Sequence, residues 1–355
     1  MIFSNHKISA RQMQAAIVLI IFSSSLIGLP STAVYNIYSV IIGALITAAE
    51  CIIICAASKR LEYSSKIKWL INTAAGVSLI IYAGINIKLL CSAVSMYLLP
   101  KTPFWITAAV FVLAALYMAC LGTQPAGRTG EIIFVIVAVN AVLAAGICLY
   151  DTKGGLLTAA FEQAGEDVVI NGLKCSFMFG GVQSLFILLP GTDGEKKEKK
   201  AVYAVIIALA AVVVFTYTAV SKFGLNDTSE RLFPALNIMD TVNLEALFGD
   251  KQDVLMLRMW FFAVFAAVGF EILIFGRALS AERLFKPMAI IGASAAFVTS
   301  FLFDDINIAI AALYVTGGAS LALFAVLAPV LSIFVKKVDG KNADVNKNKS
   351  EKAAC

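Results

Sequence analysis

Histidine is almost missing from this 355-residue chain, since the single example, His6, lies before the first apolar run. A Ser-His-Asp triad or a histidine-ligated metal site in the rest of the chain is therefore excluded. Paired cysteine spacings are missing too: five of the seven cysteines lie inside apolar runs, where we interpret them as small packing residues. We expect no metal site, no cofactor and no enzyme activity.

Charged residues are scarce as well. They make up 14% of the chain, against about a quarter in a soluble domain, while 60% of the residues are hydrophobic. Three runs, Met13–Pro30, Phe104–Leu121 and Ala201–Val220, contain no charged residue. Each reaches the roughly 18 residues that a helix needs to cross a bilayer core. The sequence therefore predicts an integral membrane protein without a soluble catalytic domain.

Nucleotide motifs are also lacking. The segment Gly191–Lys197 is similar to a P-loop in composition, but it lacks the four-residue gap between glycines and the Gly-Lys-Ser/Thr ending. The net charge of +5 does not indicate nucleic-acid binding, because the lysines cluster in short segments between apolar runs. We interpret them as topology signals, and we expect neither ATP as an energy source nor a nucleic-acid partner.

Polar segments divide the chain into about ten predicted transmembrane helices, which form a single domain over residues 10–335. A short tail, 1–9, precedes this domain and a basic tail, 336–355, follows it. The predicted helices cover approximately residues 10–34, 38–57, 69–99, 103–121, 130–150, 171–190, 200–221, 254–276, 287–303 and 306–335. The predicted fold class is thus an all-α membrane protein in a lipid bilayer.

The distribution of Lys and Arg predicts the orientation. With a cytoplasmic N-terminus, 20 of the 28 basic residues fall in cytoplasmic segments, and six fall in outside segments. Basic residues are enriched on the cytoplasmic side of membrane proteins. We therefore predict an even number of helices and two cytoplasmic termini.

Ten helices divide into two sets of five, residues 10–150 and 171–335, that enter the membrane from opposite sides and can form inverted repeats. Each set begins with a helix that carries an interruption. Helix 1 contains Ser23–Ser25 and Gly28–Pro30, and helix 6 contains Phe177–Gly181. Because both interruptions lie near mid-bilayer, we predict that helices 1 and 6 are discontinuous.

A broken helix in a membrane exposes backbone N–H and C=O groups that lipid cannot satisfy, so such breaks line a cavity or contact a ligand. A carboxylate suits the N–H groups, and a cation or ammonium suits the carbonyl oxygens. An amino acid or another small polar nutrient fits this interpretation. The alternative is ordinary packing, since glycine permits close helix contacts and serine bonds back to its own helix.

Two glutamates, Glu50 and Glu271, lie inside predicted helices 2 and 8. An ionisable group inside a bilayer is unfavourable unless it is paired or hydrated. Either these residues are protonatable groups of a gate or relay, or they snorkel to the cytoplasmic surface or pair with a basic residue there.

The segment between predicted helices 7 and 8, Lys222–Asp253, is the largest outside segment. It mixes charged residues with amphipathic stretches such as Leu232–Leu236 and Leu244–Phe248. Three interpretations are open: a structured cap over the vestibule, a segment that lies on the bilayer surface, or a segment that binds a partner.

Short motifs over nearly the whole chain resemble the spore germination permease family, the membrane-embedded B subunits of nutrient germinant receptors in the amino acid–polyamine–organocation superfamily. The order and spacing of the motifs carry the resemblance. The motifs are Lys7–Gln12, Leu29–Ser31, Leu99–Ile106, Arg128–Phe134, Leu189–Pro190, and Asp253 followed by Trp260.

This resemblance implies a LeuT-like fold of two inverted five-helix repeats, with a nutrient site between helices 1, 3, 6 and 8. It also implies assembly with A-type and C-type receptor subunits in the spore inner membrane. Carried over by position, the ligand-binding residues are Ser24, Ser25 and Gly28 on helix 1, and Phe179, Gly180 and Gly181 on helix 6.

Two functions stay open at this point. The first is a germinant receptor subunit, in which binding of a nutrient, such as an amino acid, shifts a conformational equilibrium and triggers germination. The second is a secondary active amino-acid transporter coupled to H⁺ or Na⁺.

Overall fold

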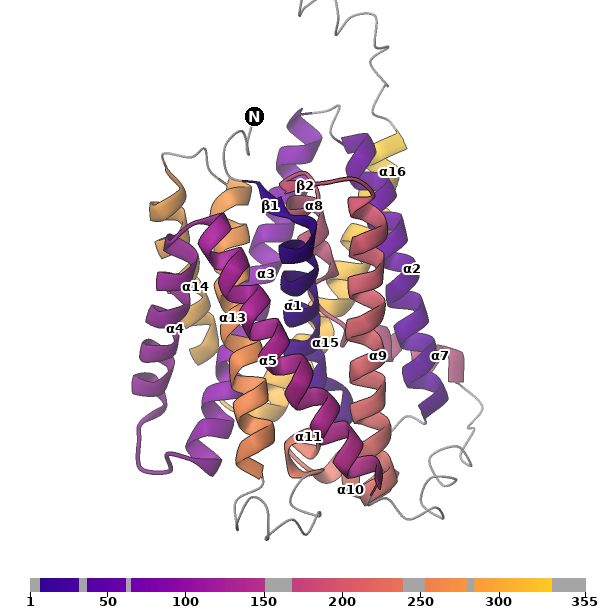
Figure 1. Cartoon of the computed structure of the whole chain (residues 1–355), viewed down its shortest axis with the longest axis vertical. Helices are drawn as coiled ribbons and strands as arrows, with labels where there is room; N and C mark the ends of the chain where they lie inside the picture. Colours follow the sequence, from indigo (N-terminus) through magenta and orange to yellow (C-terminus); the bar gives the residue numbers. More distant parts are fainter. Residues whose placement is uncertain are drawn as a thin grey trace, which may run out of the picture.

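The computed structural model describes residues 7–31, 37–61, 65–150, 168–238, 253–279 and 284–333. In these residues the chain is almost entirely helical, and most of the long helices run along the long axis of the molecule (Figure 1). The predicted tail 336–355 and the loop residues 239–252 lie outside the described part.

The helices match the predicted spans. Among the described residues, six spans are long and apolar enough to cross a membrane: α2 (Ile37–Leu61), α3 (Ser65–Tyr97), α5 (Thr123–Tyr150), α9 (Lys197–Phe223), α13 (Asp253–Leu279), and a last span of α15 (Ile306–Ser320), the π-helical η4 (Leu321–Leu327) and α16 (Ala328–Ile333). Shorter apolar stretches are Ala10–Leu26 of α1 (Ala10–Ser31), α4 (Phe104–Cys120) and α14 (Phe285–Phe301). The remaining span is divided into α7 (Val168–Ser176), the 3-10 turn η1 (Val182–Ser184) and α8 (Leu185–Leu188). A multi-pass, all-α membrane protein with about ten transmembrane helices is confirmed.

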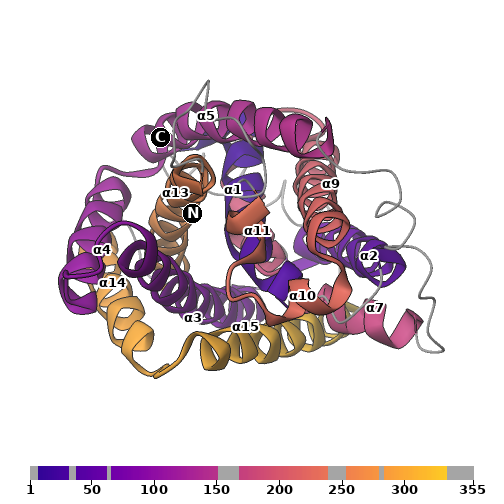
Figure 2. The same cartoon turned by 90° about the horizontal axis from the view of Figure 1, so that it is seen from below.

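Helices α3 and α13 form the core of the bundle. Their apolar spans are 72% and 83% buried, respectively, against 22% for α5. The peripheral helices expose large apolar side chains, such as Leu45 on α2, Val142 on α5 and Val315 on α15. Lipid tails are as apolar as these side chains, so their exposure suits a membrane protein. Helix α1 also lies near the middle of the bundle (Figure 2).

The predicted interruption of helix 1 is not seen, because α1 is helical from Ala10 to Ser31. The hydroxyl groups of Ser23 and Ser24 donate hydrogen bonds to the carbonyl oxygens of Ile20 and Ile21 in the preceding turn. Serines that bond back in this way remain part of a helix. The serine run therefore does not end the helix, and the prediction of a discontinuity there is corrected.

Short elements close the two ends of the bundle. At one end, near the top of Figure 1, β1 (Ile8–Ser9) pairs in parallel with β2 (Thr192–Asp193). At the opposite end, α10 (Leu225–Glu230) and α11 (Pro234–Asn237) lie across the bundle, with α11 over α1 (Figure 2). Since α11 is largely buried, the described part of the segment Lys222–Asp253 is a structured cap.

Candidate ligand site at the helix 6 break

The sixth span is broken in the middle of the bundle, as predicted. Helix α7 ends at Ser176, and helical structure resumes at Val182. In between, the backbone N–H groups of Phe177, Met178 and Phe179 bond three residues back rather than four, which tightens the last turn. Gly181 then has a φ of +98°, a left-handed conformation that favours glycine.

Three helices surround the break. A Cβ atom on Gly180 would overlap the ring of Tyr82 on α3, and one on Gly181 would overlap the side chain of Ile20 on α1. On α15, a Cβ atom on Gly317 would overlap the carbonyl group of Phe177. Glycine is therefore required on the break for the close approach of α3 and α1, and on α15 for its close approach to the break.

Backbone groups at the break are buried, and one of them is bound by α1. The Ser25 hydroxyl donates to the carbonyl oxygen of Met178 at 3.1 Å. The N–H groups of Gly180 and Gly181 form no hydrogen bond within the described part of the chain. Both glycines are buried, so this part of the break offers two donors in the middle of an apolar bundle.

Five of the six residues predicted to bind the ligand come together here. Ser25, Gly180 and Gly181 lie at the break, Phe179 is buried beside them, and a Cβ atom on Gly28 would lie 3.2 Å from the Met178 sulfur. Ser24 does not join them, because its hydroxyl bonds back to α1. A binding role for any of the six stays a prediction.

An aromatic lid closes the bundle on one side of the break. We define it as Tyr97, Phe233, Asn237 and Trp260. The Phe233 ring lies 6.3 Å from both the Tyr97 ring and the Trp260 ring, measured between centroids. The Trp260 indole N–H donates to the carbonyl oxygen of Ser23 on α1 at 2.8 Å, and the Tyr97 hydroxyl donates to Asn237 Oδ1 at 2.6 Å. Phe233 and Trp260 are fully buried.

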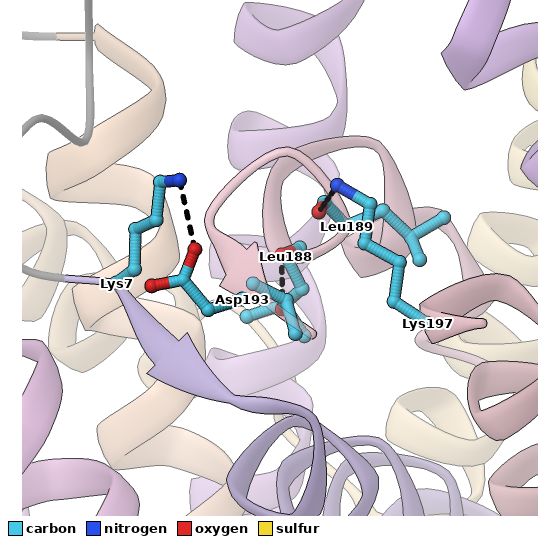
Figure 3. A network of polar contacts seen from close by, with 6 residues as sticks. Lys7, Leu188, Leu189, Asp193 and Lys197 are labelled. Atoms are coloured by element: carbon cyan, nitrogen blue, oxygen red, sulfur yellow. Dashed lines mark hydrogen bonds and ion pairs between the residues drawn. The ribbon is translucent and has the colours of Figure 1, made fainter. Parts of the chain in front are cut away.

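An ionic latch closes the other side. We define it as β1, β2 and the Lys7–Asp193 pair, whose Nζ and Oδ1 atoms are 2.8 Å apart (Figure 3). Beside it, Lys197 Nζ donates to the carbonyl oxygen of Leu189 at 2.8 Å. The latch thus joins the N-terminal segment to the turn that follows α8. A pocket beneath it is lined by nine residues: Ile8, Thr123, Ile187, Leu188, Gly191, Phe270, Leu273, Ile274 and Arg277.

The glutamates Glu50 and Glu271 lie inside the bundle rather than at its surface, with 6% and 1% exposure. Glu50 lies on α2 and Glu271 on α13. In the described part of the chain, neither glutamate forms an ion pair, and Glu271 Oε2 has no hydrogen-bond partner. Such groups can take up and release protons, but this role stays a prediction.

Several residues at the break were missed by the sequence interpretation. Tyr82 packs on Gly180, Trp260 binds the Ser23 carbonyl, and Gln183 Nε2 donates to Ser78 Oγ at 3.4 Å. The pair Gly317–Gly318 was a usable signal, since two adjacent glycines in a membrane helix indicate that another backbone comes close.

Comparison with known proteins now identifies the family. A family model described as a spore germination protein matches residues 7–307. The chain belongs to this family. Two relatives from Bacillus subtilis (strain 168) match it: spore germination protein YndE is 23% identical over 308 residues, covering 79% of this chain and 82% of the relative. The putative spore germination protein YfkT is 22% identical over 182 residues, covering 49% and 48%. The resemblance predicted from motifs is confirmed.

Solved structures of transporters share the fold of this spore germination family member. A substrate-bound Na⁺-coupled sialic acid symporter has a TM-score of 0.64 at 13% identity, covering 92% of this chain and 89% of the symporter. Mhp1, a nucleobase-cation-symport-1 family transporter in a closed conformation with bromovinylhydantoin bound, has a TM-score of 0.62 at 13% identity, covering 93% and 81%. MhsT in complex with L-phenylalanine has a TM-score of 0.57 at 15% identity, covering 95% of both chains.

This likeness shows the fold, which is the predicted LeuT-like arrangement of two inverted five-helix repeats. The relatives and the structural neighbours are permeases and transporters rather than enzymes. Fold alone does not assign a ligand, because sites of different function occur on one fold.

Proposed function

We propose that this chain is the transporter-like subunit of a spore nutrient germinant receptor. It binds a small nutrient, most simply an amino acid, at the helix 6 break and passes the resulting change to A-type and C-type subunits in the spore inner membrane. Both termini, and with them the ionic latch, lie on the cytoplasmic side. The observation that carries the proposal is the buried break itself. There the Ser25 hydroxyl of α1 donates a hydrogen bond to the carbonyl oxygen of Met178.

The arrangement around the break supports a ligand-controlled equilibrium. The break lies between two separate closures, and its own backbone provides two buried donors. A ligand that binds the break better in one conformation than in another shifts the population toward that conformation, and nothing more is needed for a receptor. The family of the chain supplies the biological context, and MhsT supplies an example of the fold with an amino acid bound.

The alternative function is a secondary active amino-acid transporter. The buried carboxyl groups of Glu50 and Glu271 favour it, because a proton or Na⁺ that binds there could couple to movement of the bundle. In proteoliposomes, a transporter would accumulate labelled L-alanine or L-phenylalanine on its own when a pH or sodium gradient is applied. A receptor subunit would bind these amino acids without accumulating them.

The proposal is tested by Gly181→Ala in spores, with Gly122→Ala as the matched control. Both glycines have a φ of +98°, but a Cβ atom on Gly181 would overlap Ile20, whereas nothing lies within 4 Å of one on Gly122. Both changes therefore place an alanine at a left-handed φ, at a cost of about 1–2 kcal/mol. We expect the Gly181 change alone to abolish germination with amino acids, measured as loss of refractility in spores with equal receptor abundance.

If Gly181→Ala does not accumulate, the double variant Ile20→Ala/Gly181→Ala restores space for the new methyl group, because Ile20 is its nearest neighbour. An unchanged nutrient response in an abundant Gly181 variant would refute a ligand site at the break. An equal loss in the Gly122 variant would attribute the effect to backbone strain instead.

A further inference from the structure

Asn86, on α3, is a fully buried amide that forms no hydrogen bond with any described residue. It has 0% exposure, and neither Nδ2 nor Oδ1 forms a hydrogen bond to any residue in the described part of the chain. An asparagine amide has two donors and an acceptor, and lipid can satisfy none of them. No other part of the proposed function uses this residue.

Helical geometry places Asn86 on the face of α3 that is turned toward the break. Tyr82, one turn earlier on the same face, packs against Gly180. Gly84 lies on the opposite face, where a Cβ atom would meet Thr299 and Ala296 of α14, because successive residues are turned by roughly 100°. Asn86 is therefore turned away from α14 and toward the centre of the bundle.

Along α3, Asn86 lies between the break and the aromatic lid. It is about 6 Å from the level of Tyr82 and about 16 Å from the level of Tyr97, at a rise of about 1.5 Å per residue. Tyr97 lies eleven residues farther along the same face and belongs to the lid. The unpartnered amide thus lies on the face of α3 that carries Tyr82 and Tyr97, at a level between these two residues.

We propose that Asn86 binds the head group of a small neutral amino acid, with Nδ2 donating to the ligand carboxylate and Oδ1 accepting from the ligand ammonium. This inference rests on the proposed function, and it names the ligand class of that site. An amide presents a donor and an acceptor side by side. They match the α-carboxylate, which accepts, and the α-ammonium, which donates, of an amino acid. A sugar, whose hydroxyl groups surround the whole ring, would need several such partners.

The chemistry of the surrounding face favours a ligand with an uncharged side chain. Between Tyr82 and Tyr97, α3 carries two ionisable side chains, Lys88 and Cys91. Lys88 is the charged one. The Lys88 Nζ atom donates to the Asp304 carbonyl oxygen and lies 4.8 Å from the centroid of the Phe104 ring, away from the break. Two of the described neighbours at the break, Ile20 and Phe179, are apolar. An apolar ligand side chain fits beside these two residues.

The experiment measures thermal unfolding of the purified full-length protein in detergent, with L-alanine, L-phenylalanine and D-glucose as probes. We expect an amino acid, but not glucose, to raise the melting temperature of the wild type. Asn86→Leu should abolish this shift. Asn72→Leu is the matched control, because Asn72 is also a buried amide on α3 but lies far from the break, in the first turns of the helix.

A second readout separates binding from a structural role. Because the amide has no partner in the described part of the chain, Asn86→Leu should leave the melting temperature of the ligand-free protein unchanged or raise it. Asn86→Asp keeps the size but replaces the donor group with a carboxylate, so the amino acid should bind about tenfold more weakly or worse.

Each outcome decides the inference. Loss of the amino-acid shift in Asn86→Leu, with the shift kept in Asn72→Leu, supports it. A retained shift overturns the role of Asn86 but leaves the site at the break intact, and a lowered melting temperature without ligand shows a structural amide instead. If the wild type responds to neither amino acid, the inference fails, while the germination test of Gly181→Ala still decides the proposed function independently.

Discussion

The two closures of the bundle differ in their physical basis. The aromatic lid is built from three packed rings and two short hydrogen bonds, with Phe233 and Trp260 at 0% exposure and Tyr97 half-buried. The ionic latch depends on a pair whose side chains are 45% and 63% exposed, together with two-residue strands. Buried aromatic packing is worth several kcal/mol, whereas exposed ion pairs are worth about 0–1 kcal/mol.

This difference predicts which side of the bundle opens more easily. The lid excludes water from the Trp260–Ser23 hydrogen bond, so breaking this part of it exposes apolar surface as well as polar groups. The latch is already hydrated, and the loss of one ion pair leaves both charges in water. We therefore expect the latch to open at lower free energy than the lid, and the following changes test that order.

The largest effect is expected for Trp260→Ala. This change removes a fully buried ring and the donor to the Ser23 carbonyl, so the free energy of unfolding should fall by about 3–5 kcal/mol. Trp260→Phe keeps a ring but loses the donor, and should lower it by about 1 kcal/mol. Chemical unfolding of the purified protein in detergent measures both.

Trp105→Ala is the control for this prediction, because Trp105 on α4 is 58% exposed at the periphery of the bundle. Its removal should change the free energy of unfolding by less than the Trp260 change. Equal losses at the two positions would show that the lid is no tighter than a lipid-facing surface, and the contrast between the closures would fail.

A smaller effect is expected for Tyr97→Phe. The Tyr97 hydroxyl donates to Asn237 Oδ1 at 2.6 Å, and the loss of one such bond lowers stability by about 0.5–1.5 kcal/mol. Thermal unfolding should show this loss in Tyr97→Phe but not in Tyr117→Phe, since Tyr117 is 69% exposed. A stable Tyr97→Phe protein would mean that ring packing alone holds the lid.

The spans and the helix 6 break could be predicted from sequence because each has a local cause. Lipid requires long apolar helices, so charge-free runs such as Phe104–Leu121 mark them directly. Gly181 adopts a backbone conformation that favours glycine, so an adjacent glycine pair indicates a break. The start of α5 at Thr123 rather than residue 130 is a boundary error, since Pro125 is compatible with a first helical turn.

Helix 1 and the lid could not be predicted, because their causes are not local. A serine can bond to its own helix or to a neighbour, and only the folded chain shows that Ser24 does the first and Ser25 the second. The Trp260–Ser23 hydrogen bond joins residues 237 positions apart. The direction of Asn86 was hidden for a related reason: α3 is buried over most of its surface, so its apolar pattern does not mark the face turned toward the break.

The smallest effect is expected at the latch, and it should depend on salt. Asp193→Asn removes the charge that Lys7 contacts at 2.8 Å, and should change the free energy of unfolding by less than about 1 kcal/mol. Hydrogen exchange at the Ile8 amide, which bonds to the Gly191 carbonyl at 3.1 Å, reports opening of β1 from β2. Salt shortens the Debye length from about 10 Å at 0.1 M to about 3 Å at 1 M, so exchange at Ile8 should accelerate with salt in the wild type.

In Asp193→Asn, exchange at Ile8 should be fast at every salt concentration, because the attraction that salt screens is already gone. The matched control is Glu198→Gln, which removes another partly exposed ion pair, Lys59–Glu198 at 3.2 Å, and should leave exchange at Ile8 unchanged. Peptides that contain Phe233 should exchange slowly and independently of salt, since the lid contains no ion pair among the described residues. Equal salt dependence at both ends would mean that the same forces close the lid and the latch.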